Sequence, residues 1–587
     1  MLVGLVARLA FELQLAPYPR HERMRNALDD QAFFVDWAAA MAHGERLDLT
    51  VSPHEWAFWA ARQPHLPPQA PLYPALLALL SLLVGTAPAW IRAVQVAAGL
   101  ASIAGVFLVA RRRFGETAAG LAAVGAALYA PWILFEATIL RTSGLVFFFV
   151  AIVVALDRLP QPVEGVERDD RRALLGALGV GILFGLAVLF QEQFLLLWVG
   201  STLWLARNRR AAALRVVVGG AAVILPLVLW ASLAAGRLVV STASAPFNLL
   251  IANLHDAGGQ VPATTPTYDA IRLRARRSTG EGFDLAAELA RDLSAHPGDF
   301  ARLLGRKIAF LFRPFEIPDN VNFYLGKREN PVLRWLPFDY PTLLPLALAG
   351  LVLGLRRAQP AAPLLTLASL YAASLILFVP LARLRQPLAL VILVLAGAGG
   401  GELWRRLRPK PLVALAAVGA LLAAGVALRP HSLPEIRPAD WQMAGGAWEN
   451  EGRARLRSGP ASAARAAFVE ALVRNPLAAR SRSELAALDA RVSPPLPAAL
   501  PADVEALCEE GGRLAQESDL ATAGRLLERA TRLAPAHPRP WHLLSNVRFL
   551  AADREAATVA LERAVALDPY DAVLARNLAY LRGLAEN

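Results

Sequence analysis

The chain has 587 residues, of which 56% are hydrophobic, and its mean hydropathy of +0.40 is that of a membrane protein rather than a soluble domain. Its formal charge of +12 comes almost entirely from arginines in short clusters between apolar runs, a pattern typical of membrane-protein loops that argues against nucleic-acid binding. The single cysteine, Cys508, excludes internal disulfides and a cysteine-based zinc site.

Eleven apolar runs have about the length that a bilayer requires, roughly 20 helical residues. They lie at 1–16, 88–110, 116–135, 142–157, 173–190, 193–206, 214–235, 342–356, 362–381, 386–402 and 411–428. The first run carries Arg8 and lacks a small-residue cleavage site, so we interpret it as a span rather than a signal peptide. The predicted fold is therefore all-α, a polytopic bundle of about 11 to 12 spans.

Basic clusters follow alternate apolar runs, and the positive-inside rule places these clusters in the cytoplasm. They are Arg111–Arg113, Arg168 with Arg171 and Arg172, Arg207 with Arg209 and Arg210, Arg356 with Arg357, and Arg405–Lys410. Alternation then puts the loops 17–87 and 236–341, and everything after residue 429, on the opposite side. The run Pro71–Val84 begins and ends on that side, so we expect a juxtamembrane or re-entrant helix there.

An internal repeat appears in the C-terminal part of the chain. The segments Leu527–Pro535 (LERATRLAP) and Leu561–Pro569 (LERAVALDP) lie 34 residues apart, which is the tetratricopeptide period. Small and large residues recur in register in both units and in an earlier one that runs from Trp448 to Pro476. We therefore predict a membrane domain over 1–430 and a tetratricopeptide-like α-solenoid over 440–587.

The first outside loop carries a distinctive series of residues. It opens with the acidic pair Asp29 and Asp30 just after a span, continues with an aromatic amphipathic segment, and closes with Gln69-Ala-Pro-Leu-Tyr-Pro74. This series resembles the GT-C superfamily, integral-membrane glycosyltransferases that use polyprenyl-phosphate sugars. The resemblance is closest to bacterial members of the PMT/ArnT-like branch with C-terminal tetratricopeptide repeats, and it extends over most of residues 1–430.

Further stretches follow the layout of that family. They are Arg92-Ala-Val-Gln95, Tyr129–Glu136 followed by Arg141, the strand-like segment Phe247–Asn253, Gly305–Ile308, Glu316–Asn320, and the basic turn Pro380–Pro387. The hinge Gln191–Gln193 departs from the family, which often has arginine there, and this puts substrate contacts at the hinge in doubt.

Sugar transfer with inversion requires a base that removes the proton of the acceptor hydroxyl. We predict Asp30 for this role because it stands three residues before the aromatic pair Phe33 and Phe34, the spacing that the resemblance implies. Asp29 is the alternative base, and Glu136, at the outer end of its span, is a third catalytic candidate. The competing interpretation is that the aspartates only cap the following helix and that Glu136 is a solvated helix end.

The leaving group of such a reaction is a lipid phosphate, whose growing negative charge requires guanidinium or ammonium partners. Arg383 and Arg385 on an outside turn, with Lys307 and Arg141, form the predicted donor-phosphate site. The two turn arginines could instead anchor lipid headgroups, and Lys307 could simply belong to a basic amphipathic helix.

The loop histidines His54, His65 and His255 match no metal-ligand spacing, so no metal site is predicted. A divalent cation stays open as a cofactor.

The predicted function is thus transfer of a sugar from a polyprenyl-phosphate donor to an envelope acceptor at the periplasmic face of a bacterial inner membrane. Expected partners are the donor, membrane lipid, and an acceptor or protein partner held by periplasmic repeats, but no nucleic acid. The sugar and the acceptor, whether lipid, glycan or protein, stay open. Two alternatives are a transporter or polymerase of lipid-linked oligosaccharides, expected to carry charges within its spans, and a non-catalytic scaffold that works through the repeats.

Overall fold

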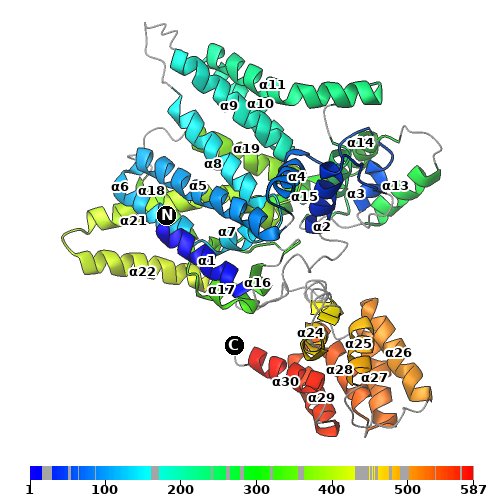
Figure 1. Ribbon diagram of the computed structural model, residues 1–587. Helices are drawn as coiled ribbons and strands as arrows, with labels where there is room; N and C mark the ends of the chain where they lie inside the picture. Colours follow the sequence, from blue (N-terminus) through cyan, green and yellow to red (C-terminus); the bar gives the residue numbers. More distant parts are fainter. Residues whose placement is uncertain are drawn as a thin grey trace. The chain divides into compact units, whose positions relative to one another are not determined.

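A computed structural model gives the architecture of the chain (Figure 1). It describes residues 1–15, 30–49, 55–63, 65–85, 87–159, 171–239, 242–259, 265–277, 283–317, 320–321, 323–354, 362–429, 448–449, 452–453, 455–456, 461–474, 479–489, 502–535, 537–568 and 572–585. The chain divides into two units, 1–16 with 27–435 and 17–26 with 436–587. Every regular element in the described ranges is a helix, which confirms the all-α prediction.

The predicted apolar runs coincide with helices of the first unit. These are α1 (Leu2–Leu15), α5 (Pro88–Phe114), α6 (Glu116–Ala127) with α7 (Ala130–Glu136), α8 (Thr142–Arg158), α9 (Arg171–Phe190), α10 (Phe194–Ala206), α11 (Arg210–Ala235), α18 (Tyr340–Gly354), α19 (Ala362–Leu377), α20 (Ala382–Arg385) with η2 (Gln386–Leu388) and α21 (Ala389–Arg406), and α22 (Pro411–Ala427). The run 116–135 is broken because Pro131 starts a new helix, as proline does at a first turn.

Four of these helices are long and apolar enough to cross a membrane by themselves. They are Ala89–Phe114, Ala173–Phe190, Arg210–Ala235 and Ala382–Arg406. Large apolar side chains such as Leu229 and Trp230 on α11, and Leu412 on α22, are more than half exposed. Soluble proteins rarely leave such side chains exposed together, so the unit is that of a multi-pass membrane protein whose outer surface is covered by lipid.

Glycines bring pairs of spanning helices into close contact. A Cβ at Gly350 of α18 would lie 1.9 Å from the carbonyl oxygen of Leu395, and one at Gly399 of α21 would lie 2.2 Å from that of Leu346. Gly181 and Gly219 form a similar contact between α9 and α11. Helices in lipid gain no hydrophobic free energy by associating, so their contacts depend on close van der Waals packing, which small residues allow.

The two predicted outside loops fold into short helices, most of which lie together at one side of the bundle, whereas the last two helices of the second loop lie beside α1 (Figure 1). The first loop forms α2 (Asp30–Ala42), α3 (Glu55–Ala60) and α4 (Leu72–Val84), and α4 is the helix expected over Pro71–Val84. The second loop forms α12 (Ala245–Asn253), α13 (Pro266–Arg277), α14 (Leu285–Ala295), α15 (Pro297–Phe312), α16 (Phe323–Glu329) and α17 (Pro331–Trp335). The hydroxyl of Tyr268 joins the loops, since it accepts from Trp59 and donates to Glu55 at 3.1 Å each.

The strand-like interpretation of Phe247–Asn253 is wrong, because the segment is helix α12. Pro246 provides the first helical turn, and Phe247, Leu250 and Ile251 form a buried face with helical rather than alternate spacing. Asn253 is the last residue of this helix, and its side chain is buried within the second loop.

In the described part of the second unit, most consecutive helices pack against one another. Its helices are α24 (Ala461–Arg474), α25 (Ala479–Asp489), α26 (Ala502–Gln516), α27 (Leu520–Leu533), α28 (Pro538–Leu550), α29 (Arg554–Leu567) and α30 (Ala572–Ala585). Helices α27 and α29 begin in the same way. Asp519 and Asp553, which are 34 residues apart, are their N-cap residues, and each follows a residue with positive φ, Ser518 or Ala552. The small positions also recur, with Ala523 and Ala557 fully buried. Pro476 and Pro569 lie outside the described residues, and the tetratricopeptide assignment stays a prediction.

Candidate active site

Asp30 stands at the first position of α2, where a carboxylate is favoured by the helix dipole. Its Oδ2 accepts from Arg383 Nη1 and from Asn320 Nδ2, both at 2.7 Å. The Asp30 and Arg383 side chains are 15% and 17% exposed, so the pair is largely enclosed but accessible. The structure thus joins the predicted base to one of the predicted phosphate ligands.

Arg383 is positioned by the short helix α20, which is fixed to the second loop. The backbone N–H of Ala382 donates to the carbonyl of Ile317 at 2.9 Å. Asn320 follows Ile317 closely in the chain, so one segment of the second loop both supports Arg383 and supplies a donor to Asp30. Three distant parts of the sequence therefore meet at this carboxylate.

Arg141, at the start of α8, belongs to the same polar region. It donates to Gln69 Oε1 at 2.8 Å, and its guanidinium lies 4.9 Å from the centre of the Phe34 ring. Burial lowers the pKa of Arg141, and the charges of Glu192, Arg383 and Asp30 act on it as well. Arg141 is therefore the third predicted residue that lies at this site.

Glu192 extends this region toward both outside loops. Its Oε1 accepts from the Ala70 backbone N–H at 3.0 Å and from Thr242 Oγ1 at 2.7 Å. We name Asp30, Arg141, Glu192, Asn320 and Arg383 the α2 cluster. The sequence offered a signal for Asn320, which closes the quoted Glu316–Asn320 segment, but it argued against Glu192, because the hinge that holds Glu192 departs from the family.

Arg385 differs from Arg383 although only one residue separates them. Its guanidinium donates to the backbone carbonyls of Arg313 at 2.8 Å and Phe315 at 2.6 Å, and it pairs with Glu316 at 3.0 Å. The side chain is 3% exposed. Burial raises the pKa of Glu316, and Arg385 opposes that shift. Arg385 therefore holds the chain of the second loop in place instead of pointing toward the α2 cluster.

Glu136 is buried, in contrast to the solvated helix end of one interpretation. It forms an ion pair with Arg8 of α1, in which Arg8 Nη2 donates to Glu136 Oε1 at 2.7 Å. A Cβ at Gly99 of α5 would lie 2.1 Å from this carboxylate, so the pair is packed where only glycine fits. Glu136 is thus partnered within the bundle and does not join the contacts around Asp30.

Lys307, a residue of α15, is fully buried where α15 faces α12. Its ammonium donates to Asn253 Oδ1 at 2.8 Å, and Asn253 in turn donates to the carbonyls of Leu249 and Leu377. Burial lowers the pKa of Lys307 to about 7. This lysine lies inside the second loop and makes no described contact with the α2 cluster. Asp29, the alternative base, lies outside the described residues.

His255, Asp292 and His296 form one further group of metal-ligand residue types in the described part of the chain. His255 Nδ1 and His296 Nδ1 lie 2.7 and 3.4 Å from Asp292 Oδ1. The two rings are stacked, however, with centroids 3.9 Å apart and planes at 22°. A metal ion about 2 Å from both nitrogens could not lie in both ring planes, so the arrangement favours two histidines sharing one carboxylate.

Residues 68–232 match the sequence profile of the family described as dolichyl-phosphate-mannose-protein mannosyltransferase. The match covers less than a third of the chain, and it includes Gln69, Arg141 and Glu192 but not Asp30 or Arg383. Among curated proteins, none matches the chain.

Similar solved structures include an oligosaccharyltransferase of Archaeoglobus fulgidus in complex with Zn and sulfate. It is 14% identical, with 78% of this chain and 56% of that chain covered and a TM-score of 0.41. AglB of the same organism, in complex with an inhibitory peptide and a dolichol-phosphate, is 16% identical, with 78% and 60% covered and a TM-score of 0.39. This chain therefore spans less than two thirds of either archaeal chain.

ArnT from Cupriavidus metallidurans, bound to undecaprenyl phosphate, is 16% identical, with 83% of this chain and 76% of that chain covered and a TM-score of 0.39. Similarity at this level does not carry the ligands of those proteins over to this chain. The family match agrees with the resemblance predicted from the sequence: residues 68–232 are similar to the dolichyl-phosphate-mannose-protein mannosyltransferases.

Proposed function

We propose that this protein transfers a sugar, with inversion, from a polyprenyl-phosphate donor to a cell-envelope acceptor. The observation that carries the proposal is the contact of Asp30 with Arg383, which joins a carboxylate to a phosphate-binding side chain at 2.7 Å. The family match supports glycosyl transfer as the reaction class. We further place the reaction at the periplasmic face of a bacterial inner membrane, as the arginine pattern of the loops predicts.

In the proposed reaction, the acceptor hydroxyl oxygen attacks the anomeric carbon while the bond from that carbon to the phosphate oxygen breaks. Asp30 takes the hydroxyl proton, and the bonding electrons leave with the lipid phosphate. Arg383 binds the charge that develops on the phosphate oxygen, with bidentate geometry available to its guanidinium. No cofactor is required to balance this step.

The ion pair itself gives the site a resting state. While Arg383 neutralises Asp30, the carboxylate is a weak base, and the guanidinium is occupied. A donor phosphate competes for Arg383, and its arrival separates the guanidinium from Asp30, which increases the basicity of the carboxylate. Arg141 and Gln69 lie beside this position and offer a second guanidinium for the phosphate.

The closed ion pairs of the bundle favour the transferase over the transporter alternative. Arg8 is paired with Glu136, and Arg113 of α5 with Asp157 of α8. A transport path through the bundle requires charged groups that face a common cavity. Arg8 and Glu136 instead face each other inside the bundle, and Arg113 and Asp157 lie at the predicted cytoplasmic ends of their helices. In the proposed enzyme, the repeats of residues 440–587 would hold the acceptor or a partner protein near the membrane.

The proposal is tested by sugar transfer with the purified full chain in lipid, supplied with a panel of polyprenyl-phosphate sugars and envelope acceptors. We expect Asp30→Asn to lower kcat by roughly 10²- to 10⁴-fold, the usual contribution of a general base. Asp36→Asn is the matched control, because Asp36 is an exposed carboxylate on the same helix and its replacement should leave the rate unchanged.

Two results would contradict the assignment. Wild-type rates in a folded Asp30→Asn protein would remove Asp30 as the base, and the absence of transfer from every donor in the panel would favour the scaffold alternative. Arg383→Gln is expected to raise the donor KM and lower kcat together, because a phosphate ligand acts in both the bound and transition states.

A further inference from the structure

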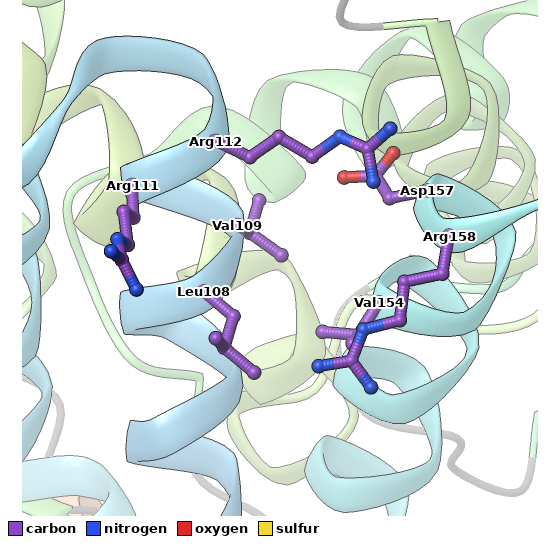
Figure 2. A pocket seen from close by; sticks show the side chains of 7 residues that line it. All are labelled: Leu108, Val109, Arg111, Arg112, Val154, Asp157 and Arg158. Atoms are coloured by element: carbon purple, nitrogen blue, oxygen red, sulfur yellow. The ribbon is translucent and has the colours of Figure 1, made fainter.

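A basic pocket lies at the arginine-rich ends of α5 and α8, away from the α2 cluster. Its volume is about 320 Å³, and it is lined by Leu108, Val109, Arg111, Arg112, Val154, Asp157 and Arg158 (Figure 2). The other end of α5 approaches the first outside loop, since Gln95 Oε1 accepts from the hydroxyl of Tyr73 of α4 at 2.9 Å. From Gln95 to Arg112 the helix rises about 25 Å, which is close to the hydrocarbon thickness of a bilayer.

The pocket has an apolar wall on the side of the spans. Gly105 brings α5 against α8, because a Cβ there would lie 2.2 Å from Val150 Cγ1. One turn further on, Leu108 and Val109 of α5 face Val154 of α8 across the pocket (Figure 2). Leu108 is partly exposed at the surface of a helix long enough to cross a membrane. The wall is therefore suited to contact with a hydrocarbon chain.

The charges around the pocket leave an excess of arginine. Arg113 pairs with Asp157, and Arg111 pairs with Glu116 at 2.6 Å, so these two guanidinium groups are neutralised. Arg112 also faces Asp157, but one carboxylate cannot neutralise the guanidinium groups of both Arg112 and Arg113. Positive charge therefore remains at Arg112 and Arg158, whose side chains are both exposed. Arg158 forms no hydrogen bond or ion pair with any residue that the structure describes. The helix ends contribute partial negative charge, but two full positive charges exceed it.

Figure 2 shows how the two remaining arginines lie. Arg112 extends from α5 over the pocket toward Asp157, and Arg158 extends from α8 back toward Leu108. The two guanidinium groups thus come from different helices and border the same space above an apolar wall. Guanidinium forks bind phosphate oxygens in pairs, and basic pockets between spans bind anionic headgroups.

We propose that this pocket binds the phosphodiester headgroup of an anionic membrane phospholipid, with Arg112 and Arg158 as its phosphate ligands. One acyl chain of the lipid lies along Leu108 and Val154. The bound lipid joins α5 to α8 at the membrane surface opposite the active site. This site is independent of the proposed transfer reaction, because none of its residues contacts the α2 cluster in the described structure.

The test uses the full chain, purified in a neutral detergent and freed of lipid, with its thermal unfolding followed during titration with phosphatidylglycerol. We expect a saturable rise of the unfolding midpoint with phosphatidylglycerol and none with phosphatidylcholine. In Arg112→Gln/Arg158→Gln the half-saturating concentration should rise roughly 25-fold, about fivefold for each arginine. The single variant Arg158→Gln should fold normally, since it breaks no described contact, and should show the smaller shift alone.

Arg207→Gln/Arg210→Gln is the matched control, because it removes two exposed arginines from another predicted cytoplasmic loop. Its lipid response should equal that of the wild type. An unchanged response in the double pocket variant, or equal stabilisation by phosphatidylcholine, would overturn the proposal. Inorganic phosphate is the last comparison: protection equal to that of phosphatidylglycerol would show a free-phosphate site and overturn the role of the lipid.

Discussion

Buried charged side chains in the membrane unit are stabilised in different ways. Glu136 has Arg8 as its counter-ion, and Glu316 has Arg385. Lys307 instead has a neutral partner, the amide oxygen of Asn253. A buried charge without a counter-ion costs free energy, and this cost is the physical reason for the lowered pKa of Lys307.

The lowered pKa of Lys307 predicts a specific pH dependence of stability. Because its pKa falls to about 7 in the folded chain and is about 10.4 when unfolded, the unfolded state binds the extra proton between these values. The stability of the wild type relative to Lys307→Met should therefore rise from pH 7 to pH 10, by a few kcal/mol at most, at about 1.4 kcal/mol for each pKa unit.

Thermal unfolding in detergent at pH 6, 7, 8 and 9 measures this difference. The matched control is Lys410→Met, which removes an exposed lysine and should shift the unfolding midpoint equally at each pH. A difference between wild type and Lys307→Met that stays constant with pH would contradict the uncompensated burial of this ammonium. In the same variant the donor KM should be unchanged if Lys307 only supports the loop, and raised if it belongs to the phosphate site as the sequence predicts.

Among elements, the contact of α18 with α21 depends on glycines whose neighbours are backbone atoms. The atom nearest to a Cβ at Gly350 would be the Leu395 carbonyl oxygen at 1.9 Å, and a carbonyl cannot rotate away as a side chain can. Gly350→Ala should therefore separate the helices and cost about 1 to 3 kcal/mol, the usual cost of overpacking. The unfolding midpoint in detergent measures the loss.

Gly419→Ala on α22 provides the control, because nothing lies within 4 Å of a Cβ at that position. This substitution should be neutral or stabilising by up to about 1 kcal/mol, since alanine is the better helix former. Equal effects of the two alanines would show that the α18–α21 seam is not the cause.

The elements were largely predictable from the sequence, whereas the partners of single side chains were not. Apolar runs and prolines located the spans, because periodicity and length are local properties. Arg383 and Arg385 looked equivalent in the sequence, but side chains two positions apart on a helical turn point in different directions. Arg385 therefore meets Glu316, and Arg383 meets Asp30. Pairings of this kind depend on tertiary contacts that no local pattern contains.

For the whole molecule, the order of the helices fixes which parts of the chain share a side of the membrane. Between Arg210 and Pro430 lie α11, α18, α19, α21 with its short leading helices, and α22. If each crosses the membrane, the two positions must lie on opposite sides. Reporter fusions after Arg210 and after Pro430 should accordingly report the cytoplasm and the exterior. Two fusions on one side would overturn both the span count and the outside location predicted for the repeats.

The pair of Arg8 and Glu136 also bears on how the protein is made. Arg8 lies in α1, and its counter-ion lies in α7, which is synthesised later, after the first outside loop and α5. A lone arginine in the middle of a span costs about 3 kcal/mol during insertion, and Glu136 alone would carry a similar penalty. The arginine in α1 therefore lacks its counter-ion, and insertion of α1 stays unfavourable, until α7 has been synthesised. We expect residues 2–15 to integrate stably only after α7 has been synthesised, although they leave the ribosome well before it.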